Sequence, residues 1–595
     1  MSFWFKVRKF LKSLKLVQLF IKFLNWRRNI SQLKYLLIVY FFVVLIFSLL
    51  LWSPITQKTY NHNWTSFDNY INALFTTASA FSDTGLVVYD TFSHWNYFGQ
   101  AIIAILILLG GIGIFALKFF IFNYLLGRQI TSIGNVQLLQ HERGSSDVNV
   151  TIKLIISSLK FLLIVILISS ILMSIYFYYT PPQQTLGIKS YLQTQGAYIN
   201  PYKNWAHSFR FGFFHTISAI NNAGFDIISG NSIMPYYLNF GLQIWFIILF
   251  VIGGLGYPTI YDIHRYLKHK IRRYQGKHRF SLFTKVSIIS YILVFLVGFI
   301  LTISFEATSK SQNTIWNKVY IPGAYYQEYN SWLSAVNNNQ KLPHLLNITN
   351  SNNLSDSELK IYKLLNTSKD NLENLKHYIN QGYMYGNNFD KTFAIIFTTF
   401  STRSAGFSSV NLRDFSASSI LIWTAMMFIG AAPSSTGGGI RTTTFAVLLM
   451  TTISVLMGRK RVRMFKRAIE QKTVFMATQT FILAFVLVFF VTLITFTSFD
   501  VSGGHISTSN MVQTGSDLSK PYYDPMHIIF EVSSAFGTTG LSTGITKDLN
   551  VASKLALILT MFIGQFGVSS TLLVWKRKKS KDRSYEYIDA DLAIG

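Results

Sequence analysis

The sequence predicts an all-α polytopic membrane protein with eight transmembrane helices and four re-entrant helices, and three observations support this. Half of the 595 residues are hydrophobic and only 13% are charged, which is too apolar for an ordinary soluble protein of this length. Apolar runs long enough to cross a bilayer recur along the chain. Four glycine-centred stretches recur between these runs, which indicates an internal repeat.

The four stretches share a pattern around their glycines, which are Gly85, Gly224, Gly406 and Gly540. A large apolar residue follows each glycine. In three copies a phenylalanine stands ten residues before the glycine and Ser-Ala stands six and five before it. The third copy departs at both places, with Ile396 and Phe400-Ser401. We therefore expect the four copies to share one structural role.

The repeated unit is a span, a half-length helix, a glycine stretch and a second span. A basic segment at 1–34 precedes repeat 1 (35–125), repeat 2 (150–262), repeat 3 (284–458) and repeat 4 (472–576), and a tail covers 577–595. Spans are expected at about 35–52, 97–122, 154–178, 237–260, 286–305, 419–456, 474–496 and 554–575. Half-length helices are expected at about 68–80, 207–222, 389–402 and 524–537. Such helices are tolerated in a membrane only where they line a cavity.

The basic residues predict the orientation. The formal charge is +28, and Lys and Arg gather between the units, around 118–153, 265–279 and 459–467, and in the tail. Short basic loops mark the cytoplasmic side, so both termini of this plasma-membrane protein are expected in the cytoplasm and the glycine stretches face outward. Residues 1–34 have the composition of a basic amphipathic helix on the membrane surface. Nucleic-acid binding is not expected, because no recognition motif accompanies the charge.

Repeat 3 contains an extracellular insertion at 306–388. Gly224 and Gly406 are 182 residues apart, whereas the neighbouring pairs of glycines are 139 and 134 apart. Ser355-Asp356-Ser357-Glu358 has the form of a capping box. A tolerated surface loop and a lid or docking loop are both compatible with this segment.

The glycine stretches suit the passage of a dehydrated monovalent cation. Backbone carbonyls can replace an ion's water when the chain turns them to one axis, and glycine permits that turn and leaves the path open. The helix C-termini add negative dipoles, and seven acids are expected near the outer mouth: Asp68, Asp83, Asp90, Asp226, Asp390, Asp414 and Asp524. We expect the ion-binding selectivity filter to contain Asp83, Thr84, Gly85, Asn222, Ala223, Gly224, Ser404, Ala405, Gly406, Thr538, Thr539 and Gly540.

Two charged residues lie where a charge is costly. Glu531 is inside the fourth half-length helix, and Arg403 stands three residues before Gly406. A charge in the middle of a membrane helix costs roughly 2.5–3.5 kcal/mol on insertion scales. We expect both to support the filter, Glu531 by bonding to a neighbouring re-entrant segment and Arg403 by bracing the filter from behind.

The second span carries G-x-x-G in three units, at 110–113, 253–256 and 564–567, a spacing that lets helices pack closely. The third unit has Pro433 and Gly437-Gly438-Gly439 instead, which cannot remain in a regular helix. Unwound chain at membrane depth must lie within protein or along water. We expect a flexible gate there, formed by Gly437, Gly438 and Gly439. A phosphate-binding loop is disfavoured, because no Gly-Lys-Ser/Thr follows.

Together these features resemble the Trk/Ktr/HKT superfamily of potassium transporters, and most closely the membrane subunit of the Ktr system. The resemblance is carried in order by residues 222–226, 403–407, 433–444 and 537–544. It implies four M1–P–M2 repeats in a pseudo-fourfold arrangement around one pore, with potassium as the transported ion because all four filter positions are glycine. It also implies a homodimer and a separate cytosolic RCK-type nucleotide-binding subunit, similar to KtrA or TrkA. A sodium requirement, known in some members, is compatible with this sequence.

One position departs from the family. Its last inner helix usually has an arginine in G-R-x-G that projects into the pore against the loop of the third unit, and Gln565 takes this place here. Losing that charge removes a barrier to cations. The gate is then either leakier or rests wholly on the Gly437–Gly439 loop.

Two other classes of protein fit less well. An alternating-access secondary transporter of another cation would show repeats of about five spans around a midplane site, not four equal re-entrant units. A membrane enzyme would need clustered catalytic groups, but the 12 histidines are scattered, cysteine is absent, and H-E-x-x-H does not occur. We expect no enzymatic activity and no covalent cofactor.

Overall fold

The computed structural model describes residues 30–58, 66–121, 148–195, 198–272, 279–311, 314–318, 384–501, 525–568 and 571. Within them the chain is helical apart from loops and one antiparallel pair of short strands, β1 (Arg463–Met464) and β2 (Arg467–Ala468). Four predicted features lie wholly or mostly outside the described residues: the amphipathic segment, the insertion with its capping box, Asp524, and the basic tail.

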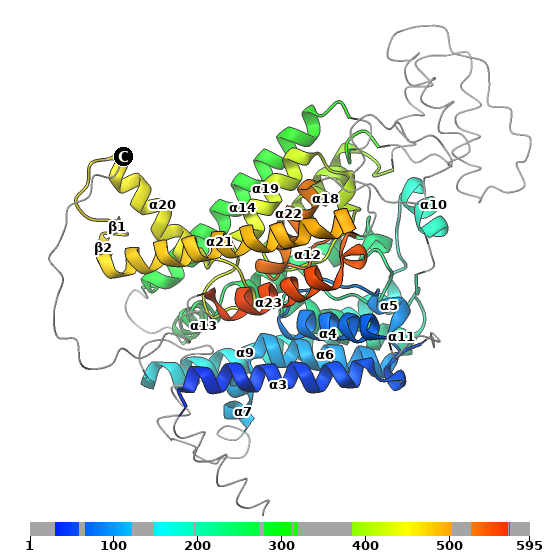
Figure 1. Ribbon diagram of the computed structural model, residues 1–595, viewed down its shortest axis with the longest axis horizontal. Coiled ribbons are helices and arrows are strands. Elements are labelled where there is room, and N and C mark those ends of the chain that lie inside the picture. The colour runs from blue at the N-terminus through cyan, green and yellow to red at the C-terminus, as the bar shows by residue number, and fades with distance from the viewer. Residues whose placement is uncertain are drawn as a thin grey trace, which may run out of the picture.

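Four long apolar helices open the four predicted repeats. They are α3 (Gln32–Trp52), α9 (Val148–Tyr179), α14 (Leu282–Thr308) and α21 (Gln471–Val501). Each contains a segment long and apolar enough to cross a bilayer. Figure 1 shows α3, α9 and α21 running in the same general direction. Large apolar side chains on these helices are exposed, such as Ile168 and Phe485, as expected of a polytopic membrane protein whose surface faces lipid.

A shorter helix packs against each long one, and its ends follow from local sequence. These helices are α4 (Phe67–Phe81), α11 (Trp205–Ile220), α18 (Asn388–Ser401) and α22 (Pro525–Phe536). The side chains of Ser66, Asn204 and Asn387 accept a backbone hydrogen bond from the first turn of α4, α11 and α18, which is the usual N-cap. All four helices are shorter than the roughly 20 residues that a span needs, and each ends just before a glycine stretch.

The second apolar helix of each predicted repeat is shorter than the sequence suggested. α6 (Tyr97–Ile112) and α12 (Phe240–Gly254) are followed by α7 (Ile114–Phe120) and α13 (Tyr257–Ile271) after bends of 85° and 105°. The bends fall at Gly113 and Gly256, which have positive φ, a conformation that glycine adopts readily and that does not continue a helix. Continuous spans at 97–122 and 237–260 were therefore the wrong expectation.

The remaining second spans are also interrupted or short. α19 (Ala417–Phe428) and α20 (Thr442–Leu456) are separated by a non-helical segment at 429–441, and α23 (Val551–Phe566) has 16 residues. In the described part of the chain four helices are long enough to cross a membrane, or six when each bent pair counts as one span. Short helices complete this part: η1 (Pro54–Thr56), α5 (Thr91–His94), α10 (Leu186–Gln195), η3 (Met234–Tyr236), η6 (Leu412–Asp414) and η7 (Thr546–Asp548).

Contacts between helices close a cycle. α6 packs on α11, α12 on α18, α19 on α22, and α23 on α4, so each second helix contacts the short helix of the next unit. In the first, second and fourth units the G-x-x-G motif packs the second helix against the short helix of its own unit. A Cβ at Gly110, Gly253 or Gly564 would lie 1.9, 2.1 or 2.0 Å from the backbone oxygen of Phe81, Ile220 or Phe536.

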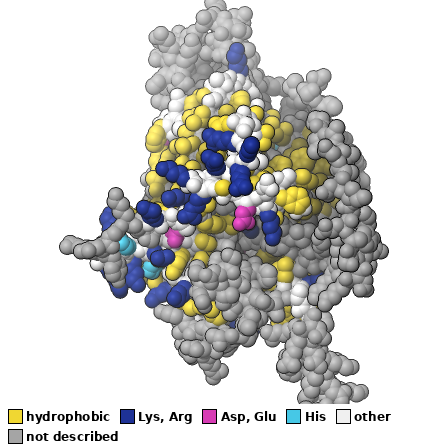
Figure 2. All heavy atoms as spheres, turned by 90° about the vertical axis from the view of Figure 1, so that its left-hand side faces the viewer, with side chains coloured by type: hydrophobic (Ala, Val, Ile, Leu, Met, Phe, Trp, Pro, Cys, Tyr) yellow, Lys and Arg dark blue, Asp and Glu magenta, His cyan; other side chains and the backbone are white. Residues whose placement is uncertain are grey.

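Basic side chains gather at one end of the molecule. Figure 2 shows a face with many Lys and Arg and few acids. The hairpin end that carries β1 and β2 contributes exposed Arg459, Lys460, Arg461, Arg463, Lys466 and Arg467. α5 and α10 lie at the opposite end of the molecule (Figure 1).

Candidate functional site

All four glycine stretches follow the same unusual backbone path. The glycines have φ between 67° and 93°, and the residue two before each also has positive φ: Asp83, Asn222, Ser404 and Thr538, between 44° and 70°. Positive φ is uncommon outside glycine, and for a β-branched residue such as Thr538 it is an outlier. Strain of this kind persists only where the surroundings enforce it, and it clusters at functional sites.

The four glycines form a closed ring, which we call the glycine ring. A Cβ added at Gly85 would lie 2.4 Å from the carbonyl oxygen of Ala223, which directly precedes Gly224. The same relation repeats from Gly224 to Ala405 (3.1 Å), from Gly406 to Thr539 (2.4 Å) and from Gly540 back to Thr84 (2.0 Å). Carbonyl oxygens thus alternate with glycines around the ring. At all four positions a methyl group would collide with neighbouring backbone, because a Cβ at Gly224 would lie 2.8 Å from Gly406 Cα.

The third stretch is one residue shorter than the others, which explains its apparent departure in sequence. In the first, second and fourth copies an N–H donates five residues back, as from Thr84 to Ser79. In the third copy Ala405 donates only four residues back, to Ser401. The structural counterpart of Phe75 is therefore the buried Phe397 rather than Ile396, and the counterpart of Ser79 is Ser401.

The glycine ring opens into one cavity of about 440 Å³. All four glycines line it, together with Asp90 and Asp226, so the structure brings the four predicted stretches to one place. Arg413 and Lys547 line the same cavity, so its wall is not purely acidic. Burial and the nearby Asp226 raise the pKa of Asp90, and Lys547 opposes this shift.

The other predicted acids have separate surroundings. Asp83 is fully buried, Asp68 lies in the first turn of α4, and Asp390 completes a capping box at the start of α18. Asp414 accepts from Lys318 and Tyr385 at 2.6 Å each. These four do not line the cavity, so a common acidic mouth was too broad an expectation.

Arg403 lies behind the glycine ring and is fully buried. Its guanidinium donates to the carbonyl oxygens of Met426 (3.2 Å), Ile429 and Gly430 (2.7 Å). Met426 lies in the last turn of α19, whose carbonyls lack an intrahelical partner, and Ile429 and Gly430 directly follow the helix. A cation there also suits the helix dipole. The guanidinium thus joins the third glycine stretch to the end of α19.

Glu531 is also fully buried, but its partners differ from the expected ones. Its Oε1 accepts from Ser542 (3.0 Å) and Thr546, which follow Gly540 in the same unit. The expectation of a bond to a neighbouring re-entrant segment was therefore wrong. The glutamate ties the fourth short helix to the chain that leaves the glycine ring.

The 429–441 segment lies directly against the residues that precede the ring glycines. The N–H of Gly438 donates to Thr538 Oγ1 at 2.7 Å, and a Cβ at Gly437 would lie 2.7 Å from the Cβ of Ser404. Arg441 donates to the backbone oxygens of Gly437 and of Gln565 (2.6 Å). The segment is thus packed beside two of the four stretches and fastened by its own arginine.

Gln565 joins this segment to a third stretch. Its Nε2 donates to Asp83 Oδ2 at 3.2 Å and to the carbonyl oxygen of Thr436 at 2.9 Å. The predicted gate residues Gly437, Gly438, Gly439 and Gln565 are therefore brought together, on the side of the ring where Asp83 and Thr538 lie.

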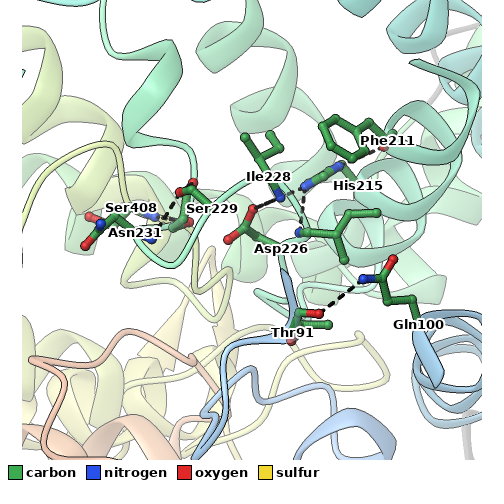
Figure 3. Close-up of polar contacts among 11 residues, drawn as sticks. Thr91, Gln100, Phe211, His215, Asp226, Ile228, Ser229, Asn231 and Ser408 are labelled. Carbon is green, nitrogen blue, oxygen red and sulfur yellow. Dashed lines mark hydrogen bonds and ion pairs between the residues drawn. The ribbon is translucent and has the colours of Figure 1, made fainter. Parts of the chain in front are cut away.

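Sequence reasoning missed His215. This fully buried residue of α11 contacts the carbonyl oxygen of Phe211 through Nδ1 at 2.8 Å, and its Nε2 accepts from the N–H of Ile227 at 3.4 Å. Nε2 also lies 3.6 Å from Asp226 Oδ1 (Figure 3). Its position immediately after Phe214, equivalent to that of Glu531 after Phe530, was the signal that could have identified it.

Helices long and apolar enough to cross a bilayer define a polytopic membrane protein. The profile of the TrkH family, described as cation transport protein, matches residues 17–327 and 385–587. The chain belongs to this family and thus to the Trk/Ktr superfamily of transporters.

The relatives cover nearly the whole chain. It is 32% identical to "Uncharacterized cation transporter MG322" of Mycoplasma genitalium, over 97% of this chain and 99% of that protein. It is 27% identical to "Ktr system potassium uptake protein D" of Bacillus subtilis, over 97% of this chain and 100% of that protein. The crystal structure of TrkH from Vibrio parahaemolyticus aligns over 85% of this chain and 78% of that chain, with 14% identity and a TM-score of 0.48.

Proposed function

We propose that this protein takes up potassium across the plasma membrane through a selectivity filter formed by the four glycine stretches. The single observation that carries the proposal is the glycine ring, in which each glycine faces the carbonyl oxygen that precedes the next glycine. Such carbonyls can replace the water shell of a monovalent cation. In this proposal the chain forms four M1–P–M2 repeats in a pseudo-fourfold arrangement around one pore, and the cycle of helix contacts supports it.

The cavity beside the ring is the outer vestibule in this proposal, and the 429–441 segment is the gate on the inner side. The basic end of the molecule (Figure 2) faces the cytoplasm, because positive loops remain inside. A cytosolic RCK-type nucleotide-binding subunit docks on this end and controls the gate, and two copies of the chain assemble as a homodimer. The name of the Bacillus subtilis relative supports potassium as the ion.

Ion uptake into liposomes tests the proposal. Purified protein is reconstituted, and rubidium uptake is measured with and without competing sodium, each with and without an added RCK-type subunit. Uptake that sodium does not compete away, and that is lost in Gly85→Asp, is the expected result. Uptake that appears only when sodium is present identifies a sodium requirement. Absence of uptake in every gradient, with the regulatory subunit added, contradicts the proposal.

A further inference from the structure

The four short helices carry different residues at one equivalent, fully buried position. The position comes directly after the phenylalanine that the four copies share once the third copy is aligned by structure. It holds Thr76 after Phe75, His215 after Phe214, Thr398 after Phe397 and Glu531 after Phe530. The hydroxyls of Thr76 and Thr398 donate to their own helix, at Asn72 (3.0 Å) and Ala394 (2.8 Å). His215 and Glu531 reach beyond their own helix, to the chain that follows their glycine.

The first and third units fasten the glycine end of their stretch with a serine. Ser79 Oγ accepts from the N–H of Gly85 at 3.0 Å, and Ser401 Oγ donates to the carbonyl oxygen of Phe407 at 2.6 Å. The equivalent serines of the second and fourth units are Ser218 and Ser534. Their hydroxyls are buried and make no hydrogen bond within the described part of the chain.

In the second and fourth units, His215 and Glu531 connect the short helix to the chain that follows the glycine. His215 meets Ile227 and Asp226, and Glu531 meets Ser542 and Thr546. Asp226 and Ser542 each stand two residues after the ring glycine, and both line the cavity. Figure 3 shows His215 pointing from its helix to the turn that carries Asp226 and Ile228.

The two kinds of support alternate around the glycine ring. Gly224 and Gly540 each neighbour Gly85 and Gly406, so the units with histidine and glutamate face each other across the ring. The positions of filter carbonyls determine which cation they fit. A buried side chain that fixes the backbone next to those carbonyls therefore influences the choice of ion.

We propose that His215 and Glu531 are positioning residues that set the cation specificity of the filter, by holding the cavity ends of the second and fourth stretches. The Nδ1 of His215 carries a proton, because the Phe211 carbonyl can only accept. Nε2 is then unprotonated and accepts the hydrogen bond from the backbone N–H of Ile227. This inference rests on the proposed function, since it concerns the same filter.

The test compares the ratio of rubidium to sodium uptake in liposomes for matched variants. His215→Thr and Glu531→Thr place the residue of the first and third units at these positions and remove the link across the turn. We expect each to lower the ratio by about tenfold, the effect of one lost buried hydrogen bond. Glu531→Gln keeps the acceptor oxygen and most of the bulk, and it should stay close to wild type.

Thr76→Val and Thr398→Val serve as controls, because they alter the same position where the hydroxyl bonds only to its own helix. They should keep the wild-type ratio. The proposal is overturned if His215→Thr and Glu531→Thr both fold and keep the wild-type uptake ratio. It is also overturned if the ratio falls equally in the two valine controls.

A second readout separates this proposal from the proposed function. The unfolding temperature of the purified protein is measured in potassium and in sodium salts, because an ion that binds the folded state stabilises it. If the proposed function is wrong, the wild-type protein itself takes up no ion and is not stabilised by potassium. If the wild type gains stability from potassium without uptake, loss of that gain in the threonine variants supports the proposal and its retention overturns it.

Discussion

The side-chain amide of Gln565 donates to the carboxylate of Asp83 at 3.2 Å, and this bond joins the last helix to the first glycine stretch. An arginine at position 565 would place a positive charge beside Asp83, where the proposed ion path leaves the filter. We predict that Gln565→Arg lowers rubidium uptake by about tenfold, because a barrier of about 1.4 kcal/mol suffices for that. Uptake into liposomes at matched protein content measures it.

A neutral variant separates charge from shape at this position. Gln565→Met keeps the length of the side chain without a positive charge, and its uptake should remain near or above that of wild type. Uptake by Gln565→Arg that equals or exceeds wild type would count against an electrostatic barrier at this place.

Gly85 cannot carry a side chain in this structure. Its φ is +93°, and a Cβ would lie 2.4 Å from the backbone oxygen of Ala223, which has little freedom to move. We predict that Gly85→Ala loses most rubidium uptake, while Gly241→Ala does not. Gly241 lies on α12, and a Cβ there meets nothing within 4 Å. Equal uptake by the two variants would show that the ring is not the path.

The short helices could be predicted closely because local sequence determines them. Residues 68–80 were expected for the first, and α4 spans Phe67–Phe81. Polar caps begin α4, α11 and α18, and glycine stretches follow all four short helices. The bends at Gly113 and Gly256 could not be predicted in the same way. The apolar pattern continues through both glycines, and only packing against the short helix and the next unit decides that the chain turns there.

The stretches of the site were also visible in the sequence, but their partners were not. Repetition identified Gly85, Gly224, Gly406 and Gly540, because a repeated glycine between apolar runs is a local signal. The register of the third copy depends on a turn that is one residue shorter, and the partners of Glu531 depend on how the chain folds back after Gly540. Both are consequences of tertiary structure.

Arg441 fastens the proposed gate. It donates to the carbonyl oxygens of Gly437 and Gln565, and hydrogen bonds to a charged group are worth about 1.5–3 kcal/mol. We predict that Arg441→Gln loosens the segment and raises rubidium uptake about tenfold without a regulatory subunit, the population shift that such an energy gives. Arg459→Gln, an exposed position on the basic face, is the control. Lower uptake in Arg441→Gln would mean that the arginine holds the path open.

Arg403 joins the third glycine stretch to the end of α19, behind the proposed filter. Arg403→Met fills similar volume but leaves the carbonyls of Met426, Ile429 and Gly430 without their donor. We predict a loss of about 2–3 kcal/mol in the free energy of unfolding, measured by denaturation in detergent. Arg403→Lys should lose less, since an ammonium keeps the charge but not the planar set of donors. Stability equal to wild type in both variants would remove the bracing role.

We expect Asp90 to make uptake through the proposed outer vestibule depend on external pH. Burial and the neighbouring Asp226 raise its pKa above the usual range, with Lys547 opposing, so the carboxylate gains a proton at a higher pH than an ordinary aspartate does. The neutral form attracts cations less. We predict that acidification lowers rubidium uptake at low ion concentration, where capture limits the rate, and much less at saturation. Asp90→Asn should already show the lower uptake at neutral pH and lose much of the pH dependence, whereas Asp68→Asn on α4, away from the cavity, should keep it. A full pH response in Asp90→Asn would assign the effect to another group.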